Sequence, residues 1–344
     1  MTPSDASAKT VVAYGEVMLR LKSPGHERLL QSPAFEVCVG GAEMNVLASL
    51  MRFGRPTRLV TTLPDHALGE AALAEIRALG IEASRINRQP GRMGLYFLEG
   101  GQGSRAGQVI YDRAGSAFAA DVTERVWPEL LADAGLLHLT GITPALSERC
   151  AFECLEAARH ARRLGIPVSV DVNHRAQLWT AAGKRPAAVL APLLREADLL
   201  FASSRDLQMI LELPQPSAPL DEAFGDLTAA ALKHLPQLKL VGTCIRLGEH
   251  SDHVRIFAMG RGRAEFHRTV ERQILSIVDR VGAGDAFAAG VLHGILGGRS
   301  LGPALEFGLA AAALKHTIPG DINRVSEAEV SACVSGTPAS LLRR

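Results

Sequence analysis

A glycine-rich segment late in the chain combines residue types that phosphoryl transfer needs. Residues 279–287 read DRVGAGDAF and lead into an apolar, helix-forming run. Gly282 and Gly284 allow a tight turn into that helix, so the N–H groups around Ala283 stay free to bind an anion. Asp285 lies in the first helical turn, beside that anion, where a carboxylate can accept a proton from an attacking hydroxyl. Donors for a moving phosphoryl group and a base therefore occur together.

The same residues have a plainer interpretation. Asp285 alone is also typical of a residue that caps a helix, and the two glycines are typical of an ordinary turn. The segment is not a Walker P-loop, because the Gly-Lys-Ser/Thr ending is absent. It is not a dinucleotide fingerprint either, because it lies late in the chain and lacks a third glycine at the right spacing.

Two separated motifs resemble those of one known family. Residues 279–287 resemble the C-terminal signature of the ribokinase-like (PfkB-type) carbohydrate kinases, and residues 39–45 (VGGAEMN) resemble the N-terminal one. The similarity runs from about residue 11 to about residue 325. The resemblance implies a kinase that uses ATP and Mg²⁺, with Asp285 as general base and the turn before it as anion hole. Some relatives also use a monovalent cation.

Within that family, the chain resembles the 2-keto-3-deoxygluconate kinases most. The segments that carry this likeness are 94–97 (GLYF), 111–113 (YDR), 139–144 (LTGITP) and 171–175 (DVNHR). The resemblance implies phosphorylation of a 2-keto-3-deoxy sugar acid to its 6-phosphate. A carboxylate is well bound by an arginine with hydroxyl donors nearby, and Arg113, Tyr96 and Tyr111 supply these groups. A solvated surface arginine is the alternative for Arg113.

Further substrate contacts are expected from both halves of the chain. Gly40 and Gly41 would let the main chain approach a sugar closely, and Asn45 would bind one hydroxyl. By the resemblance, Arg175 lies between the substrate and the ATP phosphates. Asp321 matches a late acidic position that touches substrate, with an ordinary turn aspartate as the alternative.

The nucleotide is expected at the ends of the later strands. The predicted nucleotide contacts are Asn173, Arg175, Ser203, Arg246, Gly248, Gly282 and Gly284. The family's Asn-x-x-Glu motif, which is tied to magnesium placement, is replaced here by residues 203–206 (SSRD). Because Mg²⁺ tends to keep its waters, Asp206 is expected to hold the metal indirectly, through water. Asp171 is either a buried structural acceptor or a direct participant.

Strands and helices alternate along most of the chain, which favours a mostly parallel sheet covered on both faces. Residues 11–21 are expected to form the first strand. Residues 93–99 and 108–113 interrupt the alternation and predict a hairpin. The fold class is therefore α/β, and the resemblance implies a ribokinase-like three-layer α/β/α sandwich with a small β-sheet lid. The expected kinase domain covers residues 10–330, with a flexible tail at 1–9 and lid strands near 14–22, 33–40, 92–100 and 106–114.

Composition excludes several classes of partner. The 37 basic residues nearly cancel the 36 acidic ones without a block of like charge, so neither nucleic acid nor an anionic membrane is expected to bind. No apolar run is long enough to span a bilayer. The five cysteines are scattered, which favours reduced thiols in a cytoplasmic protein.

Three functions stay open from the sequence. The first is a kinase for a 2-keto-3-deoxy sugar acid. The second is a kinase for a neutral sugar such as ribose, fructose or a nucleoside. The third is a non-catalytic sugar-binding regulator, which the altered residues 203–206 motivate. The expected partners are a small sugar acid and ATP. Unpaired strand edges in a lid also favour a homodimer or higher homo-oligomer formed through the lid.

Overall fold

The computed structural model describes residues 9–213, 218–248 and 253–336. All of the predicted tail except Lys9, and most of the proline-rich loop near residues 213–219, lie outside the described residues. Within the described ranges, no helix combines the length and apolar character needed to cross a membrane.

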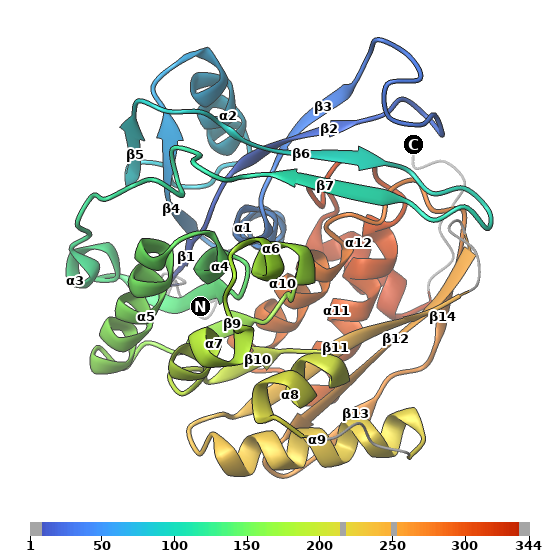
Figure 1. The fold of residues 1–344 in the computed structure, drawn as a ribbon. Helices are drawn as coiled ribbons and strands as arrows, with labels where there is room; N and C mark the ends of the chain where they lie inside the picture. The colour runs from blue at the N-terminus through green and yellow to red at the C-terminus, as the bar shows by residue number, and fades with distance from the viewer. Residues whose placement is uncertain (1–8, 214–217, 249–252, 337–344) are drawn as a thin grey trace, which may run out of the picture.

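A large, mostly parallel sheet forms the centre of the molecule (Figure 1). Its strand order is β13-β12-β11-β10-β9-β8-β1-β4-β5, with β14 also paired to β12. The parallel strands are β1 (Thr10–Tyr14), β4 (Thr57–Pro64), β5 (Ile86–Gln89), β8 (Ala134–Thr140), β9 (Val168–Asp171), β10 (Leu199–Phe201) and β11 (Leu240–Leu247). The antiparallel edge consists of β12 (His253–Gly262), β13 (Phe266–Arg268) and β14 (Arg272–Leu275).

Helices cover both faces of this sheet and enclose two hydrophobic cores. Successive residues of β1 point to opposite faces, so Val11 and Ala13 pack into one core while Val12 and Tyr14 pack into the other. The first core is covered by α1 (Ala42–Arg52), α2 (Ala67–Ala78), α10 (Ala283–Leu296), α11 (Leu301–Lys315) and α12 (Glu327–Val334). The second is covered by α3 (Trp127–Leu130), α4 (Thr143–Leu146), α5 (Glu148–Arg163), α6 (Ala176–Ala181), α7 (Pro186–Leu194), α8 (Ser204–Leu211) and α9 (Leu220–His234). The predicted three-layer α/β/α architecture is confirmed.

A second sheet of four strands stands off the main one and forms the lid (Figure 1). Its order is β3-β2-β6-β7, from β2 (Met18–Lys22), β3 (Glu36–Gly40), β6 (Gly94–Glu99) and β7 (Gln108–Asp112). Strands β6 and β7 pair antiparallel, which confirms the predicted hairpin.

The prediction of one continuous strand over residues 11–21 is wrong. The chain leaves the main sheet after Tyr14 and enters the lid at Met18. A side chain could not be accommodated at Gly15, because its Cβ would lie 2.1 Å from the carboxyl carbon of Glu43. Tertiary packing therefore divides a stretch whose local pattern is uniformly strand-like.

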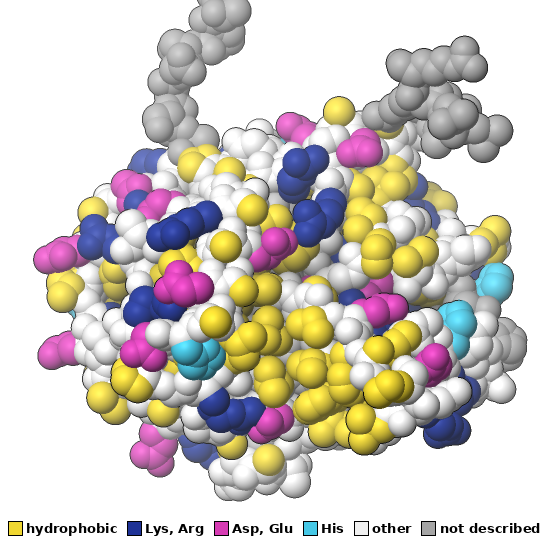
Figure 2. Space-filling view, turned by 90° about the horizontal axis from the view of Figure 1, so that it is seen from above, with side chains coloured by type: hydrophobic (Ala, Val, Ile, Leu, Met, Phe, Trp, Pro, Cys, Tyr) yellow, Lys and Arg dark blue, Asp and Glu magenta, His cyan; other side chains and the backbone are white. Residues whose placement is uncertain are grey.

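The two faces of the lid differ in chemistry. On the inner face, one row across the four strands consists of Cys38, Arg20, Tyr96 and Tyr111. On the outer face, the neighbouring row is apolar and consists of Val37, Leu21, Phe97 and Ile110. Figure 2 looks onto the molecule from the lid side and shows hydrophobic side chains gathered there. The inner face thus supplies polar groups, and the outer face offers an apolar surface.

Candidate active site

The segment predicted to form an anion hole leads into the start of α10. Gly282 caps this helix with φ of 81°, and a Cβ there would lie 1.9 Å from the main-chain oxygen of Asp321. Only glycine fits both the conformation and the space. A Cβ on Gly284 would meet nothing within 4 Å. Within the part of the chain that the structure describes, the N–H groups of Gly284 and Asp285 have no hydrogen-bond acceptor. The helix therefore begins with free donors facing open space.

Asp285 lies half-buried in the first turn of α10. Burial raises the pKa of its carboxyl to about 7, although the hydrogen bond from Asn45 and the charge of Arg175 act in the opposite direction. The amide of Asn45 donates that bond at 2.7 Å. A carboxylate with a pKa near neutrality is well matched to general-base catalysis.

Asp171 shapes the loop at the end of β9. Its carboxylate accepts a hydrogen bond from the main-chain N–H of Asn173 at 2.9 Å, and Asn173 has φ of 39°. Asparagine tolerates this left-handed conformation better than most residues do. Burial and the charge of Asp285 raise the pKa of Asp171 to about 8. This geometry supports the interpretation of Asp171 as a structural acceptor that positions Asn173.

An open cleft of about 520 Å³ lies at the carboxyl ends of β9, β10 and β11. The parallel strands of α/β proteins bind their ligands at this edge. The predicted nucleotide residues that line the cleft are Asn173, Arg175, Ser203 and Gly284, and Asp206, the predicted indirect metal ligand, lines it too. Arg175 is exposed there and has no ion-pair partner among residues 9–213, 218–248 and 253–336, so its charge is available to a phosphate.

Three of the predicted nucleotide residues, Arg246, Gly248 and Gly282, do not line that cleft. Arg246 lies near the end of β11. Burial lowers the pKa of Arg246, and the nearby charge of Arg280 lowers it further. Gly248 follows β11, and a Cβ there would lie 2.8 Å from the main-chain oxygen of His253. Close packing against β12 therefore explains why position 248 is a glycine, and no contact with a nucleotide is needed to explain it.

Ser203 and Asp206 form a capping box at the start of α8. The Asp206 carboxylate accepts hydrogen bonds from the main-chain N–H of Ser203 at 2.8 Å and from its hydroxyl at 2.7 Å. The described residues contain no cluster of three or more His, Cys, Asp or Glu side chains arranged to hold a metal ion. Asp206, one of the two aspartates that line the cleft, fits a magnesium ion that is held through water, and not a direct protein cage.

Arg113 is buried immediately after β7, with an exposed fraction of 4 %. The alternative of a solvated surface arginine is therefore wrong. Its Nε donates to Glu16 Oε2 at 2.6 Å, and Ser116 also donates to the Glu16 carboxylate. Among the residues that the structure describes, the buried Nη1 of Arg113 has no hydrogen-bond partner. An unsatisfied guanidinium nitrogen in the interior is a donor that a bound carboxylate could satisfy.

Tyr96 and Asp321, two predicted substrate residues, bind each other. The Tyr96 hydroxyl donates to Asp321 Oδ2 at 2.6 Å, and the Tyr111 ring lies 6.1 Å from that of Tyr96. A Cβ on Gly40 would lie 2.2 Å from the same Asp321 oxygen, so the glycine makes room for this carboxylate. Gly41 is similarly confined, since its Cβ would lie 2.4 Å from the main-chain oxygen of Glu16.

Arg20 is a site residue that the sequence analysis missed. Its guanidinium is 3 % exposed and pairs with Asp279 at 2.7 Å and with Asp321 at 3.0 Å. Against the desolvation of burial, the charges of Asp321 and Asp279 raise the pKa of Arg20. The available signal was an arginine inside the apolar strand pattern MLRLK. Arg20 thus links the lid to the loops on both sides of the anion hole.

Glu43, in the first turn of α1, is a buried acceptor that contacts a neighbouring part of the fold. Its carboxylate is buried and accepts hydrogen bonds from the hydroxyls of Thr140 at 2.6 Å and Thr143 at 2.7 Å. Burial raises its pKa, while these bonds and the charge of Arg113 lower it. Because Glu43 also raises the pKa of Asp285, the two carboxyls and Arg113 influence one another within the same interior region.

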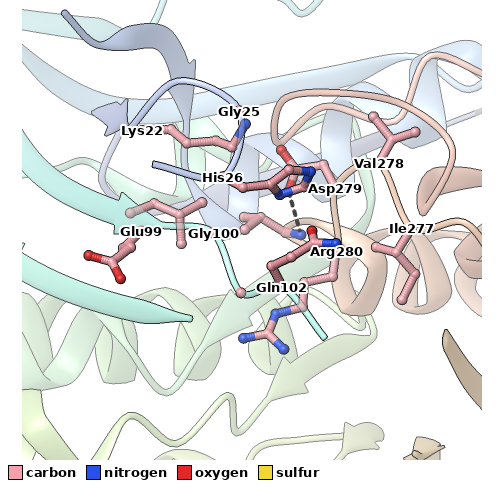
Figure 3. A pocket seen from close by; sticks show the side chains of 13 residues that line it. Lys22, Gly25, His26, Glu99, Gly100, Gln102, Ile277, Val278, Asp279 and Arg280 are labelled. Atoms are coloured by element: carbon pink, nitrogen blue, oxygen red, sulfur yellow. Dashed lines mark hydrogen bonds between the residues drawn. The ribbon is translucent and has the colours of Figure 1, made fainter. Parts of the chain in front are cut away.

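A smaller cavity of about 360 Å³ separates the tip of the lid from the loop that leads into the anion hole. Figure 3 shows Lys22, His26 and Glu99 of the lid on one side of this cavity. Residues 277–281 lie on the other side, so the cavity separates the lid tip from this loop.

Comparison with known proteins identifies relatives along nearly the whole chain. The model of the pfkB family of carbohydrate kinases matches residues 8–328. A 2-dehydro-3-deoxygalactonokinase of Haloferax volcanii is 31% identical over 97% of this chain and 99% of its own length. A 2-dehydro-3-deoxygluconokinase of Bacillus subtilis is 28% identical over 91% of each.

A solved structure shows the same fold. The 2-dehydro-3-deoxygluconokinase of Thermotoga maritima superposes with a TM-score of 0.89 and 36% identity, covering 95% of this chain and 100% of its own. The matched motifs, the three-layer fold with its lid and the free helix start beside Asp285 agree with these comparisons. The chain belongs to the pfkB family of carbohydrate kinases.

Proposed function

We propose that this kinase phosphorylates a 2-keto-3-deoxy sugar acid, such as 2-keto-3-deoxygluconate, to its 6-phosphate with ATP. The observation that carries the proposal is the buried Nη1 of Arg113, which has no hydrogen-bond partner within the described part of the chain. A sugar carboxylate bound there would satisfy this donor and form a charge-assisted bond. The hydroxyl of Tyr111, from the inner face of the lid, would bind the rest of the sugar acid, and the Tyr96 hydroxyl, which already donates to Asp321, would act there as an acceptor.

The neighbouring groups fit the transfer step. Asp285 takes the proton of the attacking 6-hydroxyl, and that oxygen forms its bond to the γ-phosphorus as the bond to the ADP oxygen breaks. The N–H groups of Gly284 and Asp285 face the charge on the moving phosphoryl group. Arg175, exposed at the cleft, offsets negative charge between the two substrates.

ATP and Mg²⁺ are proposed to bind in the cleft at the ends of β9, β10 and β11. Its volume of about 520 Å³ and its lining by Asn173 and Ser203 fit a nucleotide phosphate chain. Asp206 would hold the metal through water, and Mg²⁺ would neutralise phosphate charge there.

A homodimer formed through the lid is part of the proposal. The outer row of the lid is apolar, and its end members Val37 and Ile110 are 58% and 44% exposed. Apolar side chains gathered on one face favour association with a complementary surface (Figure 2). A second copy of the chain presents the same apolar row and could cover it.

The deciding experiment measures ATP consumption with Mg²⁺ against a panel of 2-keto-3-deoxygluconate, its galacto epimer, ribose, fructose and adenosine. Turnover limited to the two keto acids is the expected result, and their ratio then gives the preferred epimer. Turnover on a neutral sugar would contradict the role given to Arg113. Sugar binding without any turnover would instead indicate a non-catalytic regulator and place the cause at the altered residues 203–206.

A further inference from the structure

Lys315, the last residue of α11, is a buried cation without a carboxylate partner. Its side chain has an exposed fraction of 0 %, and it forms no ion pair among residues 9–213, 218–248 and 253–336. Instead, its Nζ donates to the main-chain oxygen of Ile318 at 2.9 Å and lies 3.5 Å from that of Asp279. Burying a charge is costly, so a lysine inside an otherwise apolar helix end needs an explanation.

The two carbonyl groups belong to the two loops that build the anion hole. Asp279 begins the glycine-rich segment, and Ile318 precedes Asp321, whose main-chain oxygen packs against Gly282. The Lys315 Cε lies 3.4 Å from the position of a Cβ on Gly282. The ammonium therefore lies on the packed side of the turn, whereas Gly284 faces open space.

Burial and the neighbouring charges act in opposite directions on the pKa of Lys315. Burial lowers the pKa of Lys315, whereas the nearby charges of Asp279 and Asp321 raise it. Arg20 repels the ammonium but also neutralises both of these aspartates. An ammonium held mainly by main-chain oxygens resembles a monovalent cation of potassium size in both charge and ligands.

We propose that the ammonium of Lys315 is a built-in cation of the anion hole, which makes a dissolved monovalent cation unnecessary at this position. It joins the loop at residues 277–281 to the loop at 316–321 and so fixes the turn at Gly282. It also adds permanent positive charge behind the N–H donors that face the phosphoryl group. Lys315 is thus a positioning residue. The inference rests on kinase activity and not on which sugar is the substrate.

The first test uses the unmodified protein. Phosphorylation of the sugar selected by the panel is measured at constant ionic strength in KCl, NH₄Cl and tetramethylammonium chloride. We expect kcat and the melting temperature to be the same in all three salts. A rise in either quantity that is specific to K⁺ or NH₄⁺ would overturn the proposal, and this result needs no variant that folds.

The second test removes the cation. Lys315→Ala is expected to lower kcat in tetramethylammonium chloride by about 10- to 1,000-fold, as for the loss of one preorganised stabilising group. The KM for the sugar should change little, and K⁺ or NH₄⁺ should restore part of kcat and raise the melting temperature. Lys315→Met, which fills the space, should show the loss without the rescue.

The control is Lys239→Met, since this lysine is 67% exposed, pairs with Asp198 and lies at the amino-terminal end of β11, opposite to the strand ends that form the cleft. It should behave like the unmodified protein in every salt. Full kcat for Lys315→Ala in tetramethylammonium chloride would contradict the proposal. A loss of kcat in Lys315→Ala that neither K⁺ nor NH₄⁺ reverses would also contradict the proposal. If Lys315→Ala does not fold, the salt comparison on the unmodified protein decides alone.

Discussion

The side-chain amide of Asn45 donates a 2.7 Å hydrogen bond to Asp285, a residue 240 positions later in the chain. This bond joins α1, which begins within the N-terminal motif, to α10, which begins within the C-terminal motif. It also lowers the pKa of a carboxyl that burial has raised. The two signature motifs are therefore joined by a direct side-chain hydrogen bond.

Replacing Asp285 removes the proposed base. Asp285→Asn is expected to lower kcat by about 10²- to 10⁴-fold, because the attacking hydroxyl keeps its proton. Sugar binding, measured by isothermal titration calorimetry, should be retained because the amide has the same shape. Asp226→Asn changes an exposed aspartate and is the matched control. Unchanged kcat in Asp285→Asn would rule out the assigned role.

The pH profile of the free enzyme should show the titration of Asp285. Only the ionised carboxylate accepts a proton, so kcat/KM is expected to rise with pH through about 7. The Arg175 charge lowers this pKa, so Arg175→Gln should move the acidic limb to higher pH. Arg205→Gln, from the same cleft, should leave the limb in place. A limb at the same pH in all three proteins would show that another group controls the profile.

Arg113 should govern the affinity for the sugar acid. A hydrogen bond to a charged group contributes about 1.5–3 kcal/mol, so its loss should raise KM about 10- to 150-fold, with a smaller effect on kcat. Arg113→Gln alone leaves Glu16 buried without its partner, so the variant to measure is Arg113→Gln combined with Glu16→Gln.

The control for this pair is Arg92→Gln, at an arginine that is 38% exposed and pairs with Asp112. Its KM should equal that of the unmodified protein. An unchanged KM in the double variant, with the fold intact by circular dichroism, would favour the neutral-sugar alternative.

Alanine substitutions at two glycines with nearly the same backbone conformation separate the cost of an unfavourable φ from the cost of a steric clash. Gly282 and Gly298 have φ of 81° and 77°, but a Cβ on Gly298 meets nothing within 4 Å. Gly298→Ala should cost only about 1 kcal/mol of unfolding free energy from the unfavourable φ. Gly282→Ala should cost more and abolish activity, because it displaces the Asp321 main chain. Equal losses in denaturant unfolding would mean that the turn can relax.

The apolar outer face of the lid should determine the oligomeric state. Ile110→Lys places a charge in the outer row and is expected to convert the dimer to a monomer in analytical ultracentrifugation. Val270→Lys, at an exposed apolar residue outside the lid, should leave the mass unchanged. A monomeric unmodified protein at micromolar concentration would contradict dimerisation through this face.

Local pattern was sufficient for much of the fold and for the centre of the site. The alternation of strands and helices predicted the central sheet, and the glycines at 282 and 284 predicted a free helix start because their conformational role is local. Asp285 and Asn45 could be placed in one site only through the resemblance, since nothing local indicates a bond across 240 positions.

The missed residues share one physical cause. Glu16, Arg20 and Lys315 are polar residues inside apolar stretches, and their partners lie elsewhere in the chain or on main-chain oxygens. A sequence shows that such a residue is unusual for its element, but it does not show what neutralises it. The break after Tyr14 was missed for a similar reason, because the Glu43 side chain against Gly15 is a tertiary contact.

Only residues 15–17 separate β1 of the main sheet from β2 of the lid, and Glu16 lies in that short link. A short link of this kind would act as the hinge in any rotation of the lid relative to the main sheet. In such a rotation, atoms near residues 15–17 would move little, whereas the tip of the β6–β7 hairpin near Gln102 would move most. Because Glu16 holds Arg113, the guanidinium stays close to the axis. The proposed contact between Arg113 and the carboxylate of the sugar acid would therefore be kept while the lid moves at the other end of the site.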